Sequence, residues 1–190
     1  EGVLALQVPV SVDTRKSEVM RAVLAAGADM VNDVGALEDE GALAVVAASS
    51  AAVCLMHKQG NPDAMQSAPK YVDVVAEVDD YLLERAMLAE SAGIARNRIM
   101  IDPGFGFGKT LEHNIQLLRK LADLAERGLP VLVGLSRKSM LGAITGNAVD
   151  SRQFESVAAA LLAIQRGAVV VRVHDVKPTK DAIKIMEKIG

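Results

Sequence analysis

Polar residues that could do chemistry recur along the chain, each time directly after a short apolar run. These groups are Asp13-Thr14, Asn32-Asp33, His57, Asp102, Ser136-Arg137-Lys138 and Arg172-Val173-His174-Asp175. A single group of this kind could simply cap the helix that follows it. A shared site explains all six better, because Arg, Lys and His are poor N-caps. Arg172 and His174 are two residues apart, so they face one side of a strand and could hold a phosphate or an oxyanion.

The segments around these groups alternate between two apolar patterns. Short β-branched runs predict strands, and the Ala- and Leu-rich stretches after them have helical spacing. The predicted strands are 8–13, 30–34, 52–57, 99–102, 131–136 and 169–174. The predicted helices are about 16–26, 40–48, 71–91, 112–126, one or two segments up to 165, and 179–189. Six strand–helix units in a row indicate a parallel sheet with helical crossovers.

Two architectures fit this order, an open doubly wound sheet and a (β/α)8 barrel. Six units alone suit the open sheet, since a barrel needs eight units and roughly 250 residues. Residues 1–7 favour the barrel, because they resemble the end of a helix that runs directly into a buried strand. We therefore expect a (β/α)8 TIM barrel with about six of its eight units in this chain, as one domain over 1–190 that is incomplete at its N-terminus. The carboxyl ends of barrel strands surround one mouth, where active sites lie.

Composition excludes several classes of protein. The chain has 190 residues, of which 51% are hydrophobic, and a formal net charge of -3. These values argue against disorder and give no electrostatic footprint for nucleic acid. No apolar stretch approaches the roughly 18 residues of a membrane span, and no signal peptide is visible. The single cysteine, Cys54, excludes an internal disulfide framework, so we expect a cytoplasmic protein.

The glycine-rich segment 102–110 is the most informative loop. Two of the three phenylalanines, Phe105 and Phe107, lie here between glycines. Exposed rings would offer stacking faces, although they could instead pack into the core. The segment is not a P-loop, because Pro103 stands where that motif requires its first glycine. It also fails the dinucleotide-binding spacing, because Lys109 stands in place of the third glycine.

Three further residues have less specific interpretations. Cys54 is predicted to be a small core residue, since it lies in the middle of a strand. His57 could face the mouth or merely begin a loop. His113 falls in the first turn of a helix and is expected to be solvated. No Cys/His cluster has zinc spacing, and no Gly-x-Ser-x-Gly elbow is present.

Taken together, these motifs resemble those of the dihydropteroate synthase family. The matching segments follow one another along nearly the whole chain and are 11–14, 31–34, 54–57 with Gln59-Gly60-Asn61-Pro62, 101–109, 134–140 and 172–176. The resemblance implies a (β/α)8 barrel of the folate pathway and a sulfonamide target. Its reaction joins p-aminobenzoate to 6-hydroxymethyl-7,8-dihydropterin diphosphate and releases pyrophosphate.

The resemblance also implies which residues bind the pterin. Asp102 would meet the N–H edge of the pterin, as a carboxylate meets an arginine. Asp13 and Asn32 would make further pterin contacts. Lys138 would reach the pterin as well as the p-aminobenzoate site.

The other implied roles concern p-aminobenzoate and the diphosphate. Ser139 would lie near the p-aminobenzoate carboxylate, and Phe107 would wall that site. Arg172 and His174 would hold the diphosphate with the assistance of Mg2+. Together with Lys138, these two residues would be the catalytic groups, because the reaction depends on stabilising the leaving group.

The resemblance is incomplete at the start of the chain. The family begins with an Asn-Val-Thr-Pro type motif, whose Asn helps to hold the metal, and a Ser-Thr-Arg-Pro type loop. Neither occurs here, so we expect no metal ligand in these residues and no turnover from a polypeptide of these 190 residues alone. From the family we also expect small-molecule substrates, a homodimer, and neither a nucleic acid nor a membrane partner.

Two alternative functions remain open at this point. A methyltetrahydrofolate-binding methyltransferase would share the pterin contacts but would need no diphosphate site. A non-catalytic pterin-binding protein is the other. The segments 136–139 and 172–174 favour the synthase, because they supply cations for a diphosphate.

Overall fold

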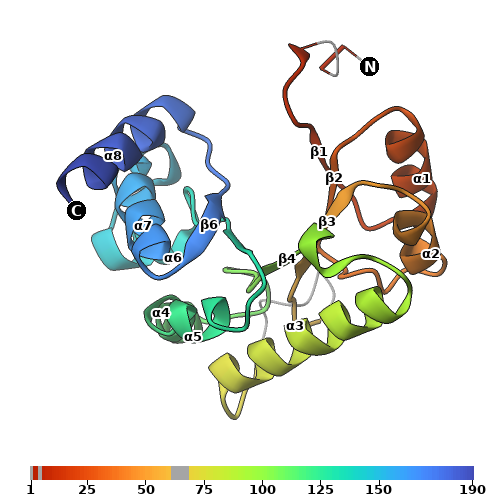
Figure 1. Ribbon diagram of the computed structural model, residues 1–190. Coiled ribbons are helices and arrows are strands. Elements are labelled where there is room, and N and C mark those ends of the chain that lie inside the picture. Colours follow the sequence, from red (N-terminus) through yellow and green to blue (C-terminus); the bar gives the residue numbers. More distant parts are fainter. Residues whose placement is uncertain (1, 4–5, 61–68) are drawn as a thin grey trace. The chain divides into compact units, whose positions relative to one another are not determined.

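The computed structural model describes residues 2–3, 6–60 and 69–190. Its internal contacts divide the chain into two compact units. The first unit comprises Glu1–Lys58 and Ala76–Pro103, and the second comprises Gln59–Val75 and Gly104–Gly190. Parallel strands alternate with helices in both units (Figure 1). None of the helices in the described part of the chain is both long and apolar enough to cross a bilayer.

The first unit is a parallel sheet covered by helices. Its strands pair in chain order and are β1 (Ser11–Asp13), β2 (Met30–Asp33), β3 (Ala52–Met56) and β4 (Ile99–Asp102). The helices are α1 (Ser17–Ala25), α2 (Ala42–Ala47), α3 (Val74–Ser91) and the 3-10 turn η2 (Arg96–Arg98). Met20 from α1, Val46 from α2 and Leu82 from α3 are fully buried. These side chains form the core against the apolar strands.

The register of this sheet determines which polar residues share a face. Asp13 is aligned with Asn32, and Asn32 is aligned with Cys54. Met56 lies two residues beyond Cys54 and is aligned with Asp102. Alternate residues of a strand face the same side, and aligned residues of parallel neighbours do so too. Asp13, Asn32 and Asp102 therefore lie on one face of the sheet.

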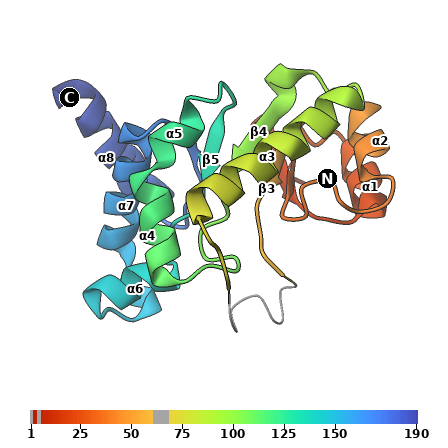
Figure 2. The ribbon, with the colours of Figure 1, turned by 90° about the horizontal axis from the view of Figure 1, so that it is seen from below.

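The second unit surrounds a parallel pair of strands with helices. β5 (Val131–Val133) pairs with β6 (Ala168–Val171), with a register shift between Val131 and Leu132. The helices are α4 (Leu111–Arg119), α5 (Leu121–Ala125), α6 (Ser139–Thr145), α7 (Gln153–Gln165) and α8 (Val176–Ile189), with the 3-10 turn η3 (Val149–Ser151). Helix α7 packs against both β6 and α8. Helix α4 contacts α5 and α6, which lie near its two ends in Figure 2.

Three element boundaries differ from the sequence prediction for identifiable reasons. The first strand begins at Ser11 rather than at residue 8, because Pro9 has no N–H and the N–H of Val10 donates to the Asp29 carboxylate. The helix predicted at 112–126 is divided at Lys120, whose ψ is 13°. Helix α8 begins three residues earlier than predicted, because a proline is tolerated in the first turn of a helix.

The helical end expected at 1–7 is described only in part. Gly2 and Val3 lie in a turn, and Leu6 donates its N–H to the Val3 carbonyl over 3.1 Å in a 3-10 arrangement. Gln7 has a φ of 54°, which ends that turn. The described residues therefore show a 3-10 turn at the predicted helical end, and residues 1, 4 and 5 lie outside the described part of the chain.

Candidate functional site

The first cluster lies at the carboxyl ends of β1, β2 and β4. Asn32 is 4% exposed, and its Nδ2 donates to Asp13 Oδ2 over 3.1 Å. Its Oδ1 is buried and accepts no hydrogen bond within the described chain. A buried polar atom without a partner lowers the stability of the fold, so it needs an explanation. Asp102 is also buried. A ligand that carries an N–H group would satisfy the Asn32 oxygen.

Asp33 follows Asn32 in β2 but faces the other side of the sheet, so it makes different contacts. Its Oδ1 accepts the Gly35 N–H and its Oδ2 accepts the Leu37 N–H, both over 2.7 Å. Ala36 and Leu37 have φ values of 48° and 60°, a conformation that non-glycine residues rarely adopt. Burial raises the pKa of Asp33 despite these hydrogen bonds. Asp33 therefore holds a strained loop in place.

His57 also faces the helices. Its ring lies edge-on to Tyr81 of α3, with the ring centroids 5.1 Å apart. The Tyr81 hydroxyl donates to Glu38 over 2.8 Å, and burial raises the pKa of Tyr81. The structure thus decides the question that the sequence left open, and His57 is not part of the first cluster. Cys54 is fully buried, so its prediction as a core residue is confirmed.

In the second unit, buried polar side chains hold the glycine-rich loop. Lys109 is 3% exposed, and its Nζ donates to the carbonyls of Gly104 and Phe107 over 3.1 and 3.2 Å. Asn114, also buried, accepts the N–H of Gly106 over 2.8 Å. From the sequence, Lys109 was notable only because it stands in place of a motif glycine, and Asn114 was not identified. Both residues act on the loop backbone, which local sequence patterns do not reveal.

The two phenylalanines of this loop have different environments. Phe105 is 1% exposed and belongs to the core, whereas Phe107 is half-buried. Lys138 Nζ lies 4.2 Å from the centroid of the Phe107 ring and donates to the Phe105 carbonyl over 2.8 Å. Gly106 has a φ of 78°, and a Cβ there would lie 3.3 Å from Lys138 Cδ. The loop therefore fixes the Lys138 ammonium against the half-buried Phe107 ring.

The far end of the loop is tied to the segment before α3. Tyr71 donates its hydroxyl to the Gly108 carbonyl over 2.9 Å. Its ring also meets His113 edge-on at 4.9 Å. His113 exchanges hydrogen bonds with Thr110 as a capping box, so the expectation that it is simply solvated is wrong. Within the matching segment 59–62, Asn61 and Pro62 lie outside the described residues.

A pocket of about 440 Å³ opens at the carboxyl ends of β5 and β6. Its lining consists of Gly134, Ser136, Arg137, Lys138, Val149, Arg172 and His174. A Cβ on Gly134 would come within 3.3 Å of Arg172 Nη2, so glycine leaves room for that guanidinium. Three permanently cationic side chains and an imidazole thus line one small space. Such a lining attracts an anion with several oxygens.

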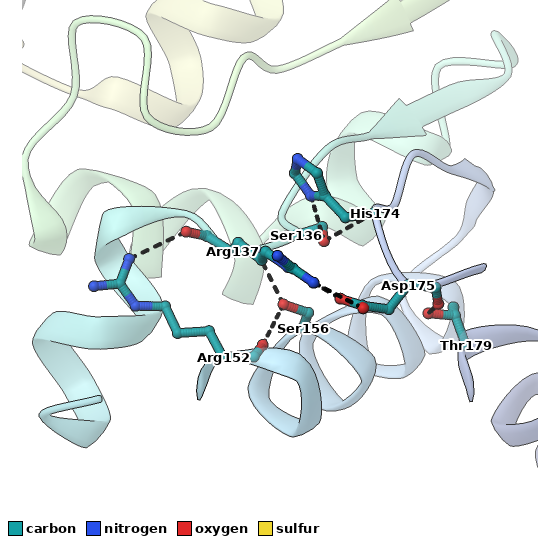
Figure 3. Close-up of polar contacts among 7 residues, drawn as sticks. All are labelled: Ser136, Arg137, Arg152, Ser156, His174, Asp175 and Thr179. Carbon is teal, nitrogen blue, oxygen red and sulfur yellow. Dashed lines mark hydrogen bonds and ion pairs between the residues drawn. The ribbon is translucent and has the colours of Figure 1, made fainter. Parts of the chain in front are cut away.

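Two contacts connect the loop after β5 with the loop after β6 (Figure 3). Ser136 Oγ lies 2.9 Å from His174 Nδ1. Arg137 donates to both carboxylate oxygens of Asp175, over 2.9 and 3.1 Å. These hydrogen bonds from Arg137 hold the pKa of Asp175 below its ordinary value. The two contacts fix the loops side by side and thereby set the spacing of the pocket's cations.

Helix α7 fastens the backbone of the first of these loops. Arg137 has a φ of 56°, and its N–H donates to Ser156 Oγ over 2.9 Å. Arg152 Nη1 donates to the Arg137 carbonyl over 3.1 Å (Figure 3) and to the Lys138 carbonyl over 3.3 Å. A Cβ on Gly142 would lie 2.2 Å from Arg152 Nη2, so this arginine needs a glycine beneath it. The sequence gives no signal for Arg152, because its partners are carbonyl groups.

The structure therefore divides the predicted site residues between two clusters. Those of the first unit are Asp13, Asn32 and Asp102, and those of the second are Phe107, Lys138, Ser139, Arg172 and His174. Ser139 is the exposed first residue of α6. In the second unit, Lys138, Arg172 and His174 line the same pocket.

The residues of this pocket do not fit a protein-bound Mg2+. Mg2+ prefers six oxygen ligands, whereas this lining presents ammonium, guanidinium and imidazole groups. Across the described residues, no group of three or more His, Cys, Asp or Glu side chains could hold a metal ion.

The described chain contains six parallel βα units with polar groups at the carboxyl ends of the strands, and its likeness to the solved structure reported below identifies them as part of a (β/α)8 barrel. A family model described as pterin binding enzyme matches residues 2–174. The chain belongs to this family of pterin-binding enzymes, as the motif resemblance implied.

Individual relatives agree with this assignment. The chain is 54% identical over 187 residues to a dihydropteroate synthase of Neisseria meningitidis serogroup C, covering 96% of this chain and 66% of that protein. It is 48% identical over 181 residues to the dihydropteroate synthase of Escherichia coli (strain K12), covering 95% and 64%. The chain thus spans about two thirds of the length of these relatives. The dihydropteroate synthase of Xanthomonas albilineans in complex with 7,8-dihydropteroate superimposes with a TM-score of 0.93 at 51% identity, covering 99% of this chain and 71% of that one.

Proposed function

We propose that the protein is a dihydropteroate synthase, a transferase that joins p-aminobenzoate to 6-hydroxymethyl-7,8-dihydropterin diphosphate. The observation that carries this proposal is the convergence of Lys138, Arg172 and His174 on one pocket. A pterin-binding barrel that only transfers a methyl group has no diphosphate to bind, so it would not need such a cationic lining. A diphosphate leaving group does need it, because its charge increases as its bond to carbon breaks.

The first cluster would bind the pterin ring. The unpaired Asn32 Oδ1 would accept one pterin N–H, which removes the cost of its burial. Asp102 would accept two N–H groups from the guanidine-like edge, in the geometry of a carboxylate on an arginine. Asp13 would act mainly on Asn32, since it accepts the Nδ2 hydrogen and so orients the amide oxygen.

The glycine-rich loop would supply the wall for p-aminobenzoate. The half-buried Phe107 ring offers an apolar face to an aromatic substrate. The Lys138 ammonium already lies over that ring and would attract the substrate carboxylate. Ser139 is exposed beside it and would add a hydrogen bond to the same carboxylate.

The reaction would form a C–N bond and break a C–O bond at the methylene carbon of the pterin. The aromatic amine supplies the electron pair of the new bond, and pyrophosphate leaves with the pair of the broken bond. The amine proton then passes to solvent or to pyrophosphate. Arg172 and Lys138 would stabilise the departing charge without first having to move, which is the main electrostatic contribution.

The cofactor, the assembly and the compartment stay predictions. Mg2+ would have to be held by the diphosphate and by residues other than those of the second-unit pocket. The homodimer and the cytoplasmic location rest on family resemblance and on cysteine usage respectively.

The test is an assay of pyrophosphate release by the complete protein, with both substrates and with each one omitted. Dihydropteroate should form only when both are present. Arg172→Gln should weaken pyrophosphate binding about a hundredfold, since a charged bidentate contact contributes about 3 kcal/mol. The exposed Arg119 of α4 provides the control, and Arg119→Gln should have no effect. Pterin binding without pyrophosphate release would instead favour the methyltransferase or non-catalytic alternative.

A further inference from the structure

The side chain of Ser136 contacts both the ring and the main chain of His174. Its Nδ1 lies 2.9 Å from Ser136 Oγ, and its main-chain N–H donates to the same oxygen over 3.2 Å. Ser136 is only 7% exposed. Figure 3 shows the second ring nitrogen, Nε2, on the side of the ring away from Ser136.

The direction of the contact between the ring and Ser136 follows from counting hydrogens. A serine hydroxyl has one hydrogen to donate and two lone pairs that accept. The His174 N–H uses one lone pair. In the part of the chain that the structure describes, Nδ1 is the one acceptor in contact with the hydroxyl hydrogen. If Nδ1 carried the ring proton, that hydrogen would be left without an acceptor in a nearly buried place, which is costly.

We propose that Ser136 is a positioning residue that fixes the neutral His174 ring with its proton on Nε2. The ring then presents an N–H donor to the pocket, and an anion there can be bound even when the ring is uncharged. The opposite tautomer would direct a lone pair at the oxygens of that anion and repel them. The inference rests on the proposed function for the identity of the anion, pyrophosphate, but the tautomer itself does not depend on any ligand.

The experiment is 15N NMR of the histidine rings in the complete, unligated protein. The chain as given contains three histidines, His57, His113 and His174, which simplifies assignment by single substitutions. Spectra are recorded near pH 8.5, about two units above the ordinary histidine pKa, so that neutral rings dominate. A fixed tautomer gives two ring nitrogens with well-separated shifts, whereas exchanging tautomers give intermediate shifts. Wild type should show Nε2–H at His174.

Three variants separate the tautomer effect from a general disturbance of the loop. Ser136→Ala should shift His174 toward a mixture of tautomers, and Ser136→Thr should restore the wild-type pattern because it keeps the hydroxyl. Ser156→Ala is the matched control, since Ser156 also bonds to this loop but through Arg137 rather than His174. It should leave the His174 shifts unchanged.

Pyrophosphate titrations of the same variants measure the consequence. Ser136→Ala should weaken binding about tenfold, the value of one hydrogen bond, with recovery in Ser136→Thr. A wild-type ring protonated on Nδ1, or equal shifts in wild type and Ser136→Ala, would overturn the inference. Wild-type protein that does not bind pyrophosphate would refute the proposed function instead, while the NMR comparison would still decide the role of Ser136.

Discussion

Replacing Asn32 by leucine would separate two effects of one side chain, its cost to the fold and its use in binding. Leucine has the same branched arrangement of heavy atoms as asparagine and is somewhat larger, so Asn32→Leu removes the polar atoms without leaving a cavity. The variant loses the unpaired, buried Oδ1 and also the hydrogen bond from Nδ2 to Asp13. These two changes act on stability in opposite directions.

The expected change in stability is small. An unpaired buried acceptor costs about 1–3 kcal/mol, and a hydrogen bond to a carboxylate contributes about 1.5–3 kcal/mol. Asp13 is exposed, so water can replace the lost donor and the loss falls at the lower end of that range. The free energy of unfolding should therefore change by less than about 1 kcal/mol, which corresponds to about 2–4 °C in Tm.

The expected change in binding is much larger. If Oδ1 accepts a pterin N–H, its loss removes at least about 1.5 kcal/mol, so the Kd should rise tenfold or more. Calorimetric titration with a pterin that lacks phosphates measures the Kd, and thermal denaturation measures Tm. Asn97→Leu is the control, because Asn97 is exposed in η2. Unchanged pterin affinity, or a loss of stability above about 3 kcal/mol, would refute the reasoning.

Two further predictions concern the backbone and the ion pair of the second unit. Gly108→Ala should lower the free energy of unfolding, measured by chemical denaturation, more than Gly146→Ala does. Both glycines have positive φ. A Cβ on Gly108 would lie 2.4 Å from the Gln59 carbonyl oxygen, whereas a Cβ on Gly146 would have no atom within 4 Å. Equal losses would show that the Gln59 contact is unimportant. Asp175→Asn should lower stability at pH 7 and progressively less as the pH falls below 3.8. The hydrogen bonds from Arg137 lower the pKa of Asp175, so its charge stabilises the fold above 3.8, and this stabilisation is lost as the pH falls through the lowered pKa. A deficit that stays the same size as the pH falls would mean that the charge of Asp175 does not matter.

The strands of this protein could be predicted because buried parallel strands are short β-branched runs, which local sequence identifies well. The predicted strand 99–102 matches β4 at both ends. The division of roles between Asn32 and Asp33 could not be predicted in the same way. Alternation requires that neighbouring residues face opposite sides, but only the register with β3 shows that Asn32 shares its face with Asp102.

The contacts that the sequence did not predict in the second unit join residues that are distant in sequence or involve the backbone. Ser136 and His174 are 38 positions apart, and Arg137 is equally distant from Asp175. Lys109 and Arg152 act on carbonyl groups, which every residue possesses, so the sequence around them contains no distinctive pattern. The cationic pocket itself was predictable, because Arg172 and His174 are unusual residues at the end of a strand.

The arginine above Gly142 has a consequence for genetic screens. Gly142 has ordinary helical dihedrals and lies in the middle of α6, so by local criteria alanine should be a harmless replacement there. Any side chain would nevertheless displace the guanidinium of Arg152 and release the backbone carbonyls of Arg137 and Lys138. A saturation screen should therefore find position 142 less tolerant than its helical dihedrals alone would suggest. The inactive alleles recovered there would be defective in loop geometry, although the residue does not line the pocket.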